Sequence, residues 1–505
     1  MAHNQIKITW RNLFKYPVYS FINLTGLSIG IAASFILLLY VQQEWSYERH
    51  IPGFERVYRV ATDFFDMGGF ASSQPILHYY LSTEAQEVES ATAVDRAYQA
   101  LPVRVNERDY QENGIFYIDS SFFRVFALPL KFGKTDGQLA TDEVIISEAI
   151  AEKYFGATEA IGQIIAIDKA QKPYKVVAVL EKQIQKSHIQ PHFLLPRAYK
   201  NEPNWTSAAI YNYVKLKPGK TETDLKKYLD QLLRTHIHPA VGGNLTFEQW
   251  YNGNSAVKFF IQPLQDIYLH SNYKFEIAAG GNPTQIRVLG IIALFIILIA
   301  VINYVNLSTA RSSIRAKEVG IKKTLGVHRK TLIRQFLLES VLFSLLAMGI
   351  AMIFSEGLLL VFERITENKL TNSLFDHWQY PAALLGFSLL TGLLAGTYPA
   401  FYLTAFNANK VLKGDLTLGG NKTLRSSLVV VQFSIAIILI ISSIIVYQQL
   451  QFLQYSDKGL TPEGVLIIEN AGDLKEKASA FKQTIEQQAQ VISTSYNNRM
   501  PAGSS

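Results

Sequence analysis

Hydrophobic residues are concentrated in five long runs along the chain, and more polar sequence fills the intervals between them. A helix needs about 20 apolar residues to cross about 30 Å of hydrocarbon, and each run is long enough. The runs are Val18–Val41, Val288–Leu307, Phe336–Phe362, Ala382–Leu403 and Leu428–Tyr447. The pattern therefore predicts a membrane protein with five helical spans.

The first run has two interpretations, a cleaved signal peptide or an uncleaved span. It is longer than a typical signal-peptide core, and Tyr40–Glu44 offers no small-residue cleavage site, so we predict an uncleaved span. Residues 1–17 contain Lys7, Arg11 and Lys15 and no acid. Because basic short segments remain inside, the chain is expected to start in the cytoplasm.

The predicted spans then place the remaining segments on alternating sides. Residues 42–285 form an outer domain, and the basic loop 407–425 lies inside. In chain order we expect a cytoplasmic segment (1–17), a first span (18–41), the outer domain (42–285), a three-helix membrane domain (286–406) with a cytoplasmic loop (311–334), a second cytoplasmic loop (407–425), a fifth span (426–447) and the start of a second outer domain (448–505).

Within 42–285, short runs of β-type residues alternate with helical stretches. The predicted strands are Arg56–Ala61, Gly114–Ile118, Glu143–Ile146, Ile164–Ile167 and Tyr174–Leu180, and the predicted helices are Ser147–Tyr154 and Thr221–Thr235. We expect Phe122, Phe123 and Phe126 in its core, because Phe is readily buried. The fold class is thus an α-helical transmembrane bundle with a mixed α/β extracytoplasmic domain inserted between spans one and two.

The loop Arg311–Arg334 between the second and third spans is strongly basic and also has a helical pattern. Its bases are Arg311, Arg315, Lys317, Lys322, Lys323, Arg329, Lys330 and Arg334, against the single acid Glu318. Ile314, Ile321 and Leu325 fall on one helical face. One interpretation is a loop that only fixes topology and rests on anionic lipid. The other is a helix that presses on a cytoplasmic partner and moves both adjoining spans.

The amino-acid sequence of this loop favours the second interpretation. Arg315–Gly326, RAKEVGIKKTLG, resembles the signature loop of the MacB/FtsX-like ABC transporter permeases almost position for position. The resemblance implies a coupling helix that docks on a separate ATP-hydrolysing subunit. The residues it assigns to docking are Arg315, Glu318, Val319, Gly320, Ile321, Lys322, Lys323, Leu325 and Gly326.

Other segments support the resemblance. Tyr117–Phe126, Val144–Gly156 and Ile161–Val179 are similar, in this order, to pieces of the family's extracytoplasmic core domain. Leu394–Leu403 with Val411–Gly414 resembles the way the family's fourth span leaves the membrane.

Small residues and one proline mark expected contacts between spans. Gly26 with Gly30, and Gly392 with Gly396, form GxxxG-type pairs that allow close helix approach. For Gly26 and Gly30 an ordinary packing pair is an equal alternative. Pro399 should kink or end the fourth span, because proline removes a helix hydrogen bond.

A weak internal repeat relates the fifth span to the first, since Tyr447–Leu450 parallels Tyr40–Gln43. Members of the family with two such units have eight spans, so we expect a second permease unit or a homodimer, and this chain reads as truncated in its second unit.

Little in the sequence indicates catalysis. The chain has no Cys, and its formal charge of +7 is largely in short loops beside spans, which indicates topology and no nucleic-acid partner. No phosphate-binding P-loop, zinc-protease motif or nucleophile elbow is present. His188 and His192 are spaced i, i+4, but Pro191 interrupts them and two ligands fall short of a metal site. We therefore predict no metal, no cofactor and no enzymatic activity.

Two acids in the third span need an explanation, because an acid at the bilayer centre costs about 2.5–3.5 kcal/mol. Glu339 lies one turn into the span, within reach of Arg334 or Lys330. Glu356 lies near the far end, where it either reaches interfacial water or belongs to a proton relay. No second acid or His on a neighbouring span accompanies it.

The function hypothesis that follows from the resemblance is a non-catalytic permease subunit in a bacterial inner membrane. It implies that motion of a separate ATPase crosses the membrane to the outer domain for export, extraction or signalling, with the lipid bilayer and a periplasmic or outer-membrane protein as further partners. The alternative is a membrane-anchored sensor that signals to a cytoplasmic kinase. A membrane enzyme is the least supported, because no catalytic cluster is visible.

Overall fold

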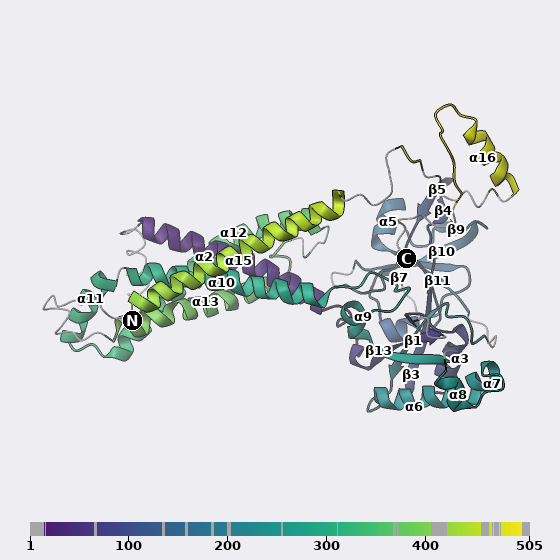
Figure 1. The fold of residues 1–505 in the computed structure, drawn as a ribbon, viewed down its shortest axis with the longest axis horizontal. Coiled ribbons are helices and arrows are strands. Elements are labelled where there is room, and N and C mark those ends of the chain that lie inside the picture. The colour runs from purple at the N-terminus through teal and green to yellow at the C-terminus, as the bar shows by residue number, and fades with distance from the viewer. Residues whose placement is uncertain are drawn as a thin grey trace. The chain divides into compact units, whose positions relative to one another are not determined.

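The chain was analysed as a computed structural model, shown in Figure 1. The structure describes residues 15, 17–64, 68–133, 137–156, 160–182, 186–198, 204–253, 256–310, 312–366, 370, 373–405, 422–455, 464–466, 468, 474 and 476–496, without the side chains of 64, 310, 312–317 and 422–425. Most of the expected cytoplasmic segment 1–17 and most of the loop 407–425 lie outside this range. The chain divides into two units, Met1–Ile435 and Ala436–Ser505.

The centre of the outer domain is a mixed sheet of 13 strands. The strands are β1 (Val57–Phe64), β2 (Gly69–Phe70), β3 (Val88–Arg96), β4 (Leu101–Val105), β5 (Arg108–Glu112), β6 (Ile115–Ile118), β7 (Leu130–Gly133), β8 (Glu143–Ser147), β9 (Ile164–Ile167), β10 (Lys172–Leu180), β11 (Phe193–Pro196), β12 (Tyr211–Leu216) and β13 (Val257–Pro263). Their order is β13-β1-β12-β3-β6-β11-β8-β10-β9-β4-β5, with β2 beside β1 and β7 beside β10. Parallel pairs join β10 to β8 and β11 to β6.

The five predicted strands are confirmed as β1, β6, β8, β9 and β10, with ends that differ by at most three residues. Helices cover the sheet, namely α3 (Pro75–Thr83), α4 (Phe122–Phe126), α5 (Glu148–Tyr154), α6 (Glu222–Leu232), α7 (His238–Val241), α8 (Phe247–Tyr251) and α9 (Leu264–His270). Ser147 caps α5, and Thr221 with Asp224 forms a capping box at the start of α6. The predicted helix Thr221–Thr235 therefore starts as expected, but after Leu232 it changes to a π-helical turn.

Leucines at helical spacing hold α6 on the sheet, because Leu225, Leu229 and Leu232 all point into one buried cluster with Trp250 of α8. A second cluster lies around α4. There Phe122 and Phe126 are fully buried and Phe123 packs against them, which confirms the core prediction for these three side chains.

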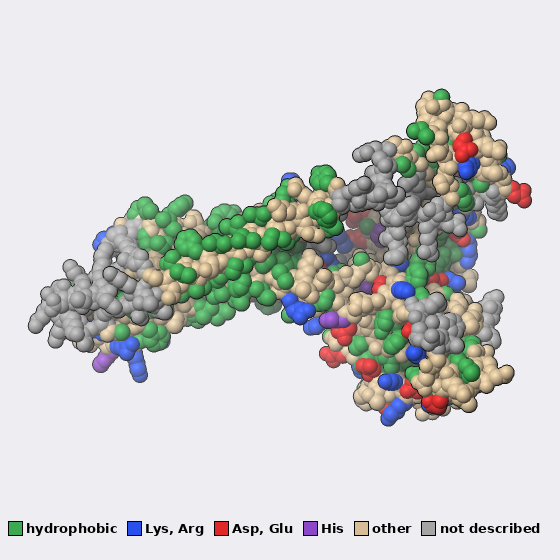
Figure 2. All heavy atoms as spheres, viewed as in Figure 1, with side chains coloured by type: hydrophobic (Ala, Val, Ile, Leu, Met, Phe, Trp, Pro, Cys, Tyr) green, Lys and Arg blue, Asp and Glu red, His purple; other side chains and the backbone are tan. Residues whose placement is uncertain are grey.

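The described residues include five helices long and apolar enough to cross a membrane. They belong to α2 (Pro17–Trp45), α10 (Pro283–Ala310), α12 (Arg329–Thr366), α13 (Gln379–Leu403) and α15 (Lys422–Tyr455). The first four pack together around a cluster that includes Leu27, Ile31, Ala300, Ala347 and Leu384. Figure 2 shows hydrophobic side chains along the outward surfaces of these helices, whereas charged side chains gather over the outer domain.

The α15 helix differs from the other four, since no residue in its most apolar stretch is buried. Its first part contacts the bundle through Asn306 of α10, whose side-chain amide donates to Gln432 at 3.3 Å. The second unit contains the remainder of α15 and the short helix α16 (Ala478–Glu486).

Candidate functional site

The basic loop folds as the helix α11 (Ser312–Thr324), which lies between α10 and α12. It ends at Thr324, and Gly326, two residues further on, has a φ of +86°, a left-handed conformation that glycine adopts without strain. Among its described side chains, Val319 is 2% exposed and packs with Leu332, Ala400 and Leu403. The buried side of α11 therefore contacts the start of α12 and the end of α13.

The opposite side of α11 is open. Ile321 is 52% exposed and Leu325 is 77% exposed. Next to them, Lys322 donates to Glu318 at 2.7 Å across one helical turn, and this exposed pair contributes little to stability. The arrangement leaves two large apolar side chains facing outward beside charged ones, which is a suitable contact surface for another protein.

A polar clamp fixes α11 to the end of α13. The Lys323 ammonium donates to the carbonyl oxygen of Thr404 at 2.8 Å, and Arg329 Nε lies 3.5 Å from the Thr404 hydroxyl. Cations at a helix C-terminus are favoured by the helix dipole. Burial, together with the charge of Arg329, lowers the pKa of Lys323. The clamp and the Val319 contact both resist movement of α11 away from α13.

The docking residues expected from the sequence thus divide between two sides of α11. Glu318, Ile321, Leu325 and Gly326 are exposed, and Lys322 is partly exposed. Val319 and Gly320 are buried against the bundle and Lys323 is engaged by Thr404, so these three differ from the expectation of a single outward surface. The physical reason is that a short helix between two spans must bury one side against them. The side chains of Arg315 and Ile314 lie outside the described set.

The four glycines singled out in the sequence lie where helices approach closely. A Cβ added at Gly30 would be 2.5 Å from Ala300 Cβ of α10, and one at Gly26 would be 3.3 Å from Asn303 Nδ2. On the other helix pair, a Cβ at Gly392 or Gly396 would lie 2.9 or 2.7 Å from a Ser Cβ of α12. At Gly30, Gly392 and Gly396 these distances are too short for a Cβ unless the neighbouring helix shifts, whereas the contact at Gly26 is tight and meets only the end of the Asn303 side chain.

Pro399 does not end α13, which corrects part of the sequence expectation. The helix continues to Leu403, and Pro399 is buried inside it beside Ala400. Helix packing on both sides of the proline stabilises the last turn in spite of the missing hydrogen bond.

Glu356 of α12 is hydrogen-bonded to the segment that follows its helix. Its Oε1 accepts from the Ser373 hydroxyl at 2.8 Å and from the Leu374 amide at 2.9 Å. The carboxylate therefore stabilises the turn that leads from α12 to α13, because a charged acceptor strengthens such hydrogen bonds.

The outer domain is joined to the first span by a compact set of contacts just after α2. The Tyr47 and Tyr268 rings stack with centroids 3.5 Å apart, and the Tyr268 hydroxyl donates to Glu44. Burial, reinforced by the Glu44 charge, raises the pKa of Tyr47 to about 12, so the phenol stays neutral. The segment after α2 is therefore packed on α9.

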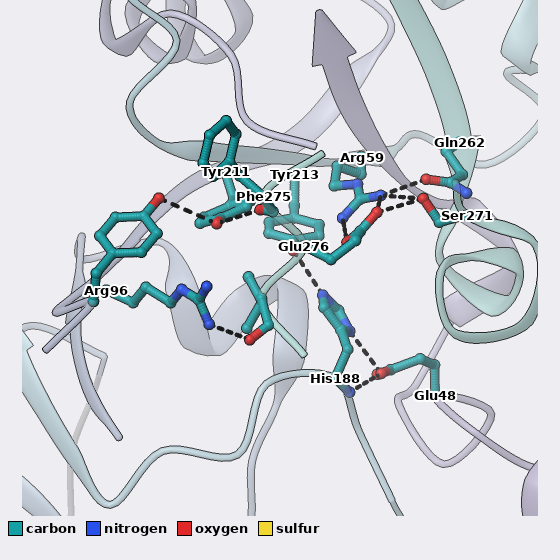
Figure 3. Close-up of polar contacts among 12 residues, drawn as sticks. Glu48, Arg59, Arg96, His188, Tyr211, Tyr213, Gln262, Ser271, Phe275 and Glu276 are labelled. Carbon is teal, nitrogen blue, oxygen red and sulfur yellow. Dashed lines mark hydrogen bonds and ion pairs between the residues drawn. The ribbon is translucent and has the colours of Figure 1, made fainter. Parts of the chain in front are cut away.

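His188 belongs to this junction and has protein partners at both ring nitrogens. Its Nδ1 lies 2.6 Å from Glu48 Oε1, and its Nε2 lies 2.6 Å from the Tyr213 hydroxyl (Figure 3). His192 is exposed. Among the residues that the structure describes, no group of three His, Cys, Asp or Glu could hold a metal ion.

A second set of contacts joins the outer domain to the segment before α10. Arg59 of β1 is fully buried, and its guanidinium donates to both carboxylate oxygens of Glu276, at 2.6 and 2.7 Å. Arg96 donates to the carbonyl of Ile277, and the Tyr211 hydroxyl donates to the carbonyl of Phe275 at 2.7 Å. Figure 3 shows these side chains converging on one stretch of backbone.

Comparison with known families explains why the helix α11, the helical bundle and the outer domain occur in one chain. A model described as the MacB-like periplasmic core domain matches residues 20–232, and one described as the FtsX-like permease C-terminal domain matches residues 290–408. The chain belongs to the MacB/FtsX-like family of ABC transporter permeases.

Named relatives agree with this assignment of the permease. YvrN of Bacillus subtilis, an uncharacterized ABC transporter permease, is 24% identical over 66% of this chain and 82% of its own length. YknZ of the same organism, also an uncharacterized ABC transporter permease, is 27% identical over 58% of this chain and 67% of its own. A macrolide export ATP-binding/permease protein, MacB of Escherichia coli, is 27% identical over 55% of this chain and 40% of its own.

Among solved structures, a domain of a putative permease protein from Porphyromonas gingivalis is 20% identical, with a TM-score of 0.35. It covers 48% of this chain and 99% of its own length. With its core domain and several apolar helices, the permease is a multi-pass membrane protein.

Sequence reasoning missed the junction residues of the permease. Arg59 lies in the middle of a predicted hydrophobic strand, and an arginine at such a position signals a buried charge that needs a partner. Nothing local in the sequence identifies that partner, since Glu276 is 217 residues away.

Proposed function

We propose that this permease transmits the motion of a separate ATPase across the membrane to its outer domain, by way of α11. The single observation that carries the proposal is the two-sided character of α11. Its Val319 side is anchored to α12 and α13, while Ile321 and Leu325 face outward. Because α11 is held in this way, a force applied to its exposed side acts directly on α12 and α13.

A separate ATPase is proposed because the MacB relative is named as an ATP-binding/permease protein and this chain covers 40% of it. The chain has no phosphate-binding P-loop of its own. ATP binding would therefore come from another polypeptide that docks on the cytoplasmic side. We place the permease in a bacterial inner membrane, with α11 inside and the core domain outside.

The output that we propose is mechanical. The relatives named for export suggest expulsion of a substrate that is already outside the membrane, and extraction or signalling would use the same motion. The described outer domain supports this, because buried side chains bond it to the segment after α2 and to the segment before α10.

The test of docking is whether a P-loop ATPase co-purifies with the full chain from its own cell membranes. Leu325→Asp places a charge at the centre of the proposed contact and should abolish recovery of the ATPase. Leu245→Asp is the matched control, because Leu245 is 45% exposed and belongs to the outer domain. Undiminished recovery with Leu325→Asp, from a chain that is expressed at the control's level, would refute the docking assignment. A histidine kinase encoded beside the gene in place of an ATPase would favour the sensor alternative.

A further inference from the structure

The two segments that connect the outer domain to α2 and to α10 both reach into the interior of the domain. Glu48 lies three residues after α2 ends at Trp45, and Glu276 lies seven residues before α10 starts at Pro283. Both carboxylates point into the domain rather than to water, because Glu48 is fully buried and the Glu276 side chain is only 16% exposed. The chain segments that connect the domain to two different spans thus each place a charge in its interior.

Buried polar side chains connect the two carboxylates. Glu48 pairs with His188, and His188 contacts the Tyr213 hydroxyl at 2.6 Å. Tyr213 of β12 lies directly opposite Arg59 of the neighbouring strand β1, and Arg59 holds Glu276 with two hydrogen bonds. We call Glu48–His188–Tyr213–Arg59–Glu276 the junction chain. Figure 3 shows it running from the exit of α2 to the segment before α10.

The first of these contacts is held in a strained backbone. Glu48 has a φ of +64°, a left-handed conformation that is unfavourable for a residue other than glycine. The conformation persists because its carboxylate accepts from three donors, namely the Ser187 hydroxyl at 2.9 Å, the His188 amide at 2.5 Å and the His188 ring. Burial by itself would raise the pKa of Glu48, but the adjacent His188 and these donors hold it below its ordinary value.

Displacement of either span from the domain would separate members of the junction chain and leave buried polar groups without their partners. Arg59, Glu48 and Tyr213 are fully buried, and separating one partner of a buried ion pair is strongly unfavourable because it leaves an uncompensated charge. The neighbouring stack of Tyr47 on Tyr268 adds a contact at the α2 side. Sliding of α2 or α10 against the sheet is thus opposed from inside the domain, whereas movement of both spans together leaves every contact intact.

We propose that the junction chain ties the exit of α2 to the entrance of α10 through the interior of the outer domain, so that the domain moves as one rigid body with this pair of helices. The inference rests on the proposed function for its purpose, since a rigid tie is what a mechanical transmitter requires. The tie itself is a property of the permease alone and is tested without any ATPase.

The test measures distances between spin labels in the full chain in lipid nanodiscs, by pulsed electron paramagnetic resonance. The protein contains no cysteine, so each pair of introduced cysteines is labelled without background. Two pairs join the domain to the spans, Glu84 with Gln42 of α2 and Glu84 with Gln285 of α10. A third pair, Glu84 with Arg108, lies within the domain. All four positions are exposed.

The perturbation is Tyr213→Phe, which removes only the hydroxyl at the middle of the junction chain. Tyr228→Phe is the matched control, because its hydroxyl is also bonded inside the domain, to the Tyr80 carbonyl at 2.9 Å, but outside this chain. We expect Tyr213→Phe to broaden the distance distributions of both domain-to-span pairs and to leave the pair within the domain unchanged. Tyr228→Phe should leave all three unchanged.

Two results would overturn the inference. One is a set of domain-to-span distributions in Tyr213→Phe as narrow as in the unmodified chain. The other is equal broadening of all three pairs, which would show that the hydroxyl only stabilises the domain. Glu276→Gln, which keeps the side-chain shape and removes the charge opposite Arg59, is the second variant and should give the same selective broadening. Because no ATPase or nucleotide is present, a failed docking experiment leaves this outcome unaffected.

Discussion

Replacement of Gly30 by alanine is a direct test of how closely α2 and α10 approach. The added Cβ would lie 2.5 Å from Ala300 Cβ. Carbon atoms in favourable contact lie about 3.5–4.0 Å apart, so the helices would have to separate by roughly 1 Å. Overpacking of this kind costs about 1–3 kcal/mol. The better helix propensity of alanine returns about 1 kcal/mol, so we expect a net loss of stability of up to about 2 kcal/mol.

The control for Gly30→Ala is Gly349→Ala in α12. No atom lies within 4 Å of a Cβ built there, so the same chemical change meets no neighbour and should be neutral or stabilising. A second control is the swap Gly30→Ala with Ala300→Gly, which moves the methyl group from one helix to the other. We expect the swap to recover most of the loss, because contacting sites are not additive.

The assay is thermal unfolding of the purified full chain in one detergent or nanodisc preparation, followed by intrinsic fluorescence. Gly30→Ala should melt below both the unmodified chain and Gly349→Ala. The reasoning about close packing would be refuted by equal melting temperatures for Gly30→Ala and Gly349→Ala, or by a swap that is no more stable than Gly30→Ala alone.

Two further predictions concern single carboxylates. Since its folded pKa is depressed, Glu48 contributes stability above the ordinary carboxyl pKa of about 4.3, and this contribution is lost as pH falls through the folded value. The melting temperature of Glu48→Gln should therefore lie below that of the unmodified chain at pH 7 and converge with it in acid; a gap independent of pH would contradict this. For Glu356, substitution by Ala should speed hydrogen exchange at the Leu374 amide, because its acceptor at 2.9 Å is lost, whereas Gln retains an acceptor and most of the protection. Equal exchange rates in Ala and Gln variants would show that the carboxylate does not stabilise the turn.

Features that depend on short-range spacing could be predicted from the sequence. Apolar runs of sufficient length identify the helices, because a helix spans a bilayer by length and composition alone. The strands β8, β9 and β10 were likewise predicted within a few residues from local β-type composition. The motif RAKEVGIKKTLG located the helix now seen as α11 and its exposed Ile321 and Leu325.

Which side of α11 faces inward was decided by the tertiary structure. Val319 and Ile321 are two residues apart and both apolar, yet Val319 is 2% exposed and Ile321 is 52% exposed. The difference arises because the ends of α12 and α13 present Leu332 and Leu403 to one side of α11 only.

By itself, the sequence determined where the apolar helices of the described residues lie, the mixed α/β character of the outer domain, the close approach at Gly30, Gly392 and Gly396, and the family. Only the tertiary structure decided how the domain is joined to the spans. Arg59 and Glu276 are 217 residues apart, and Glu48 and His188 are 140 apart. Charges this distant along the chain meet only after β1 has been placed between β12 and β13, and no local pattern records which strands will be neighbours. The physical reason is that pairing in a sheet and burial in a core depend on contacts between remote segments, whereas a span or a strand is specified by its own residues.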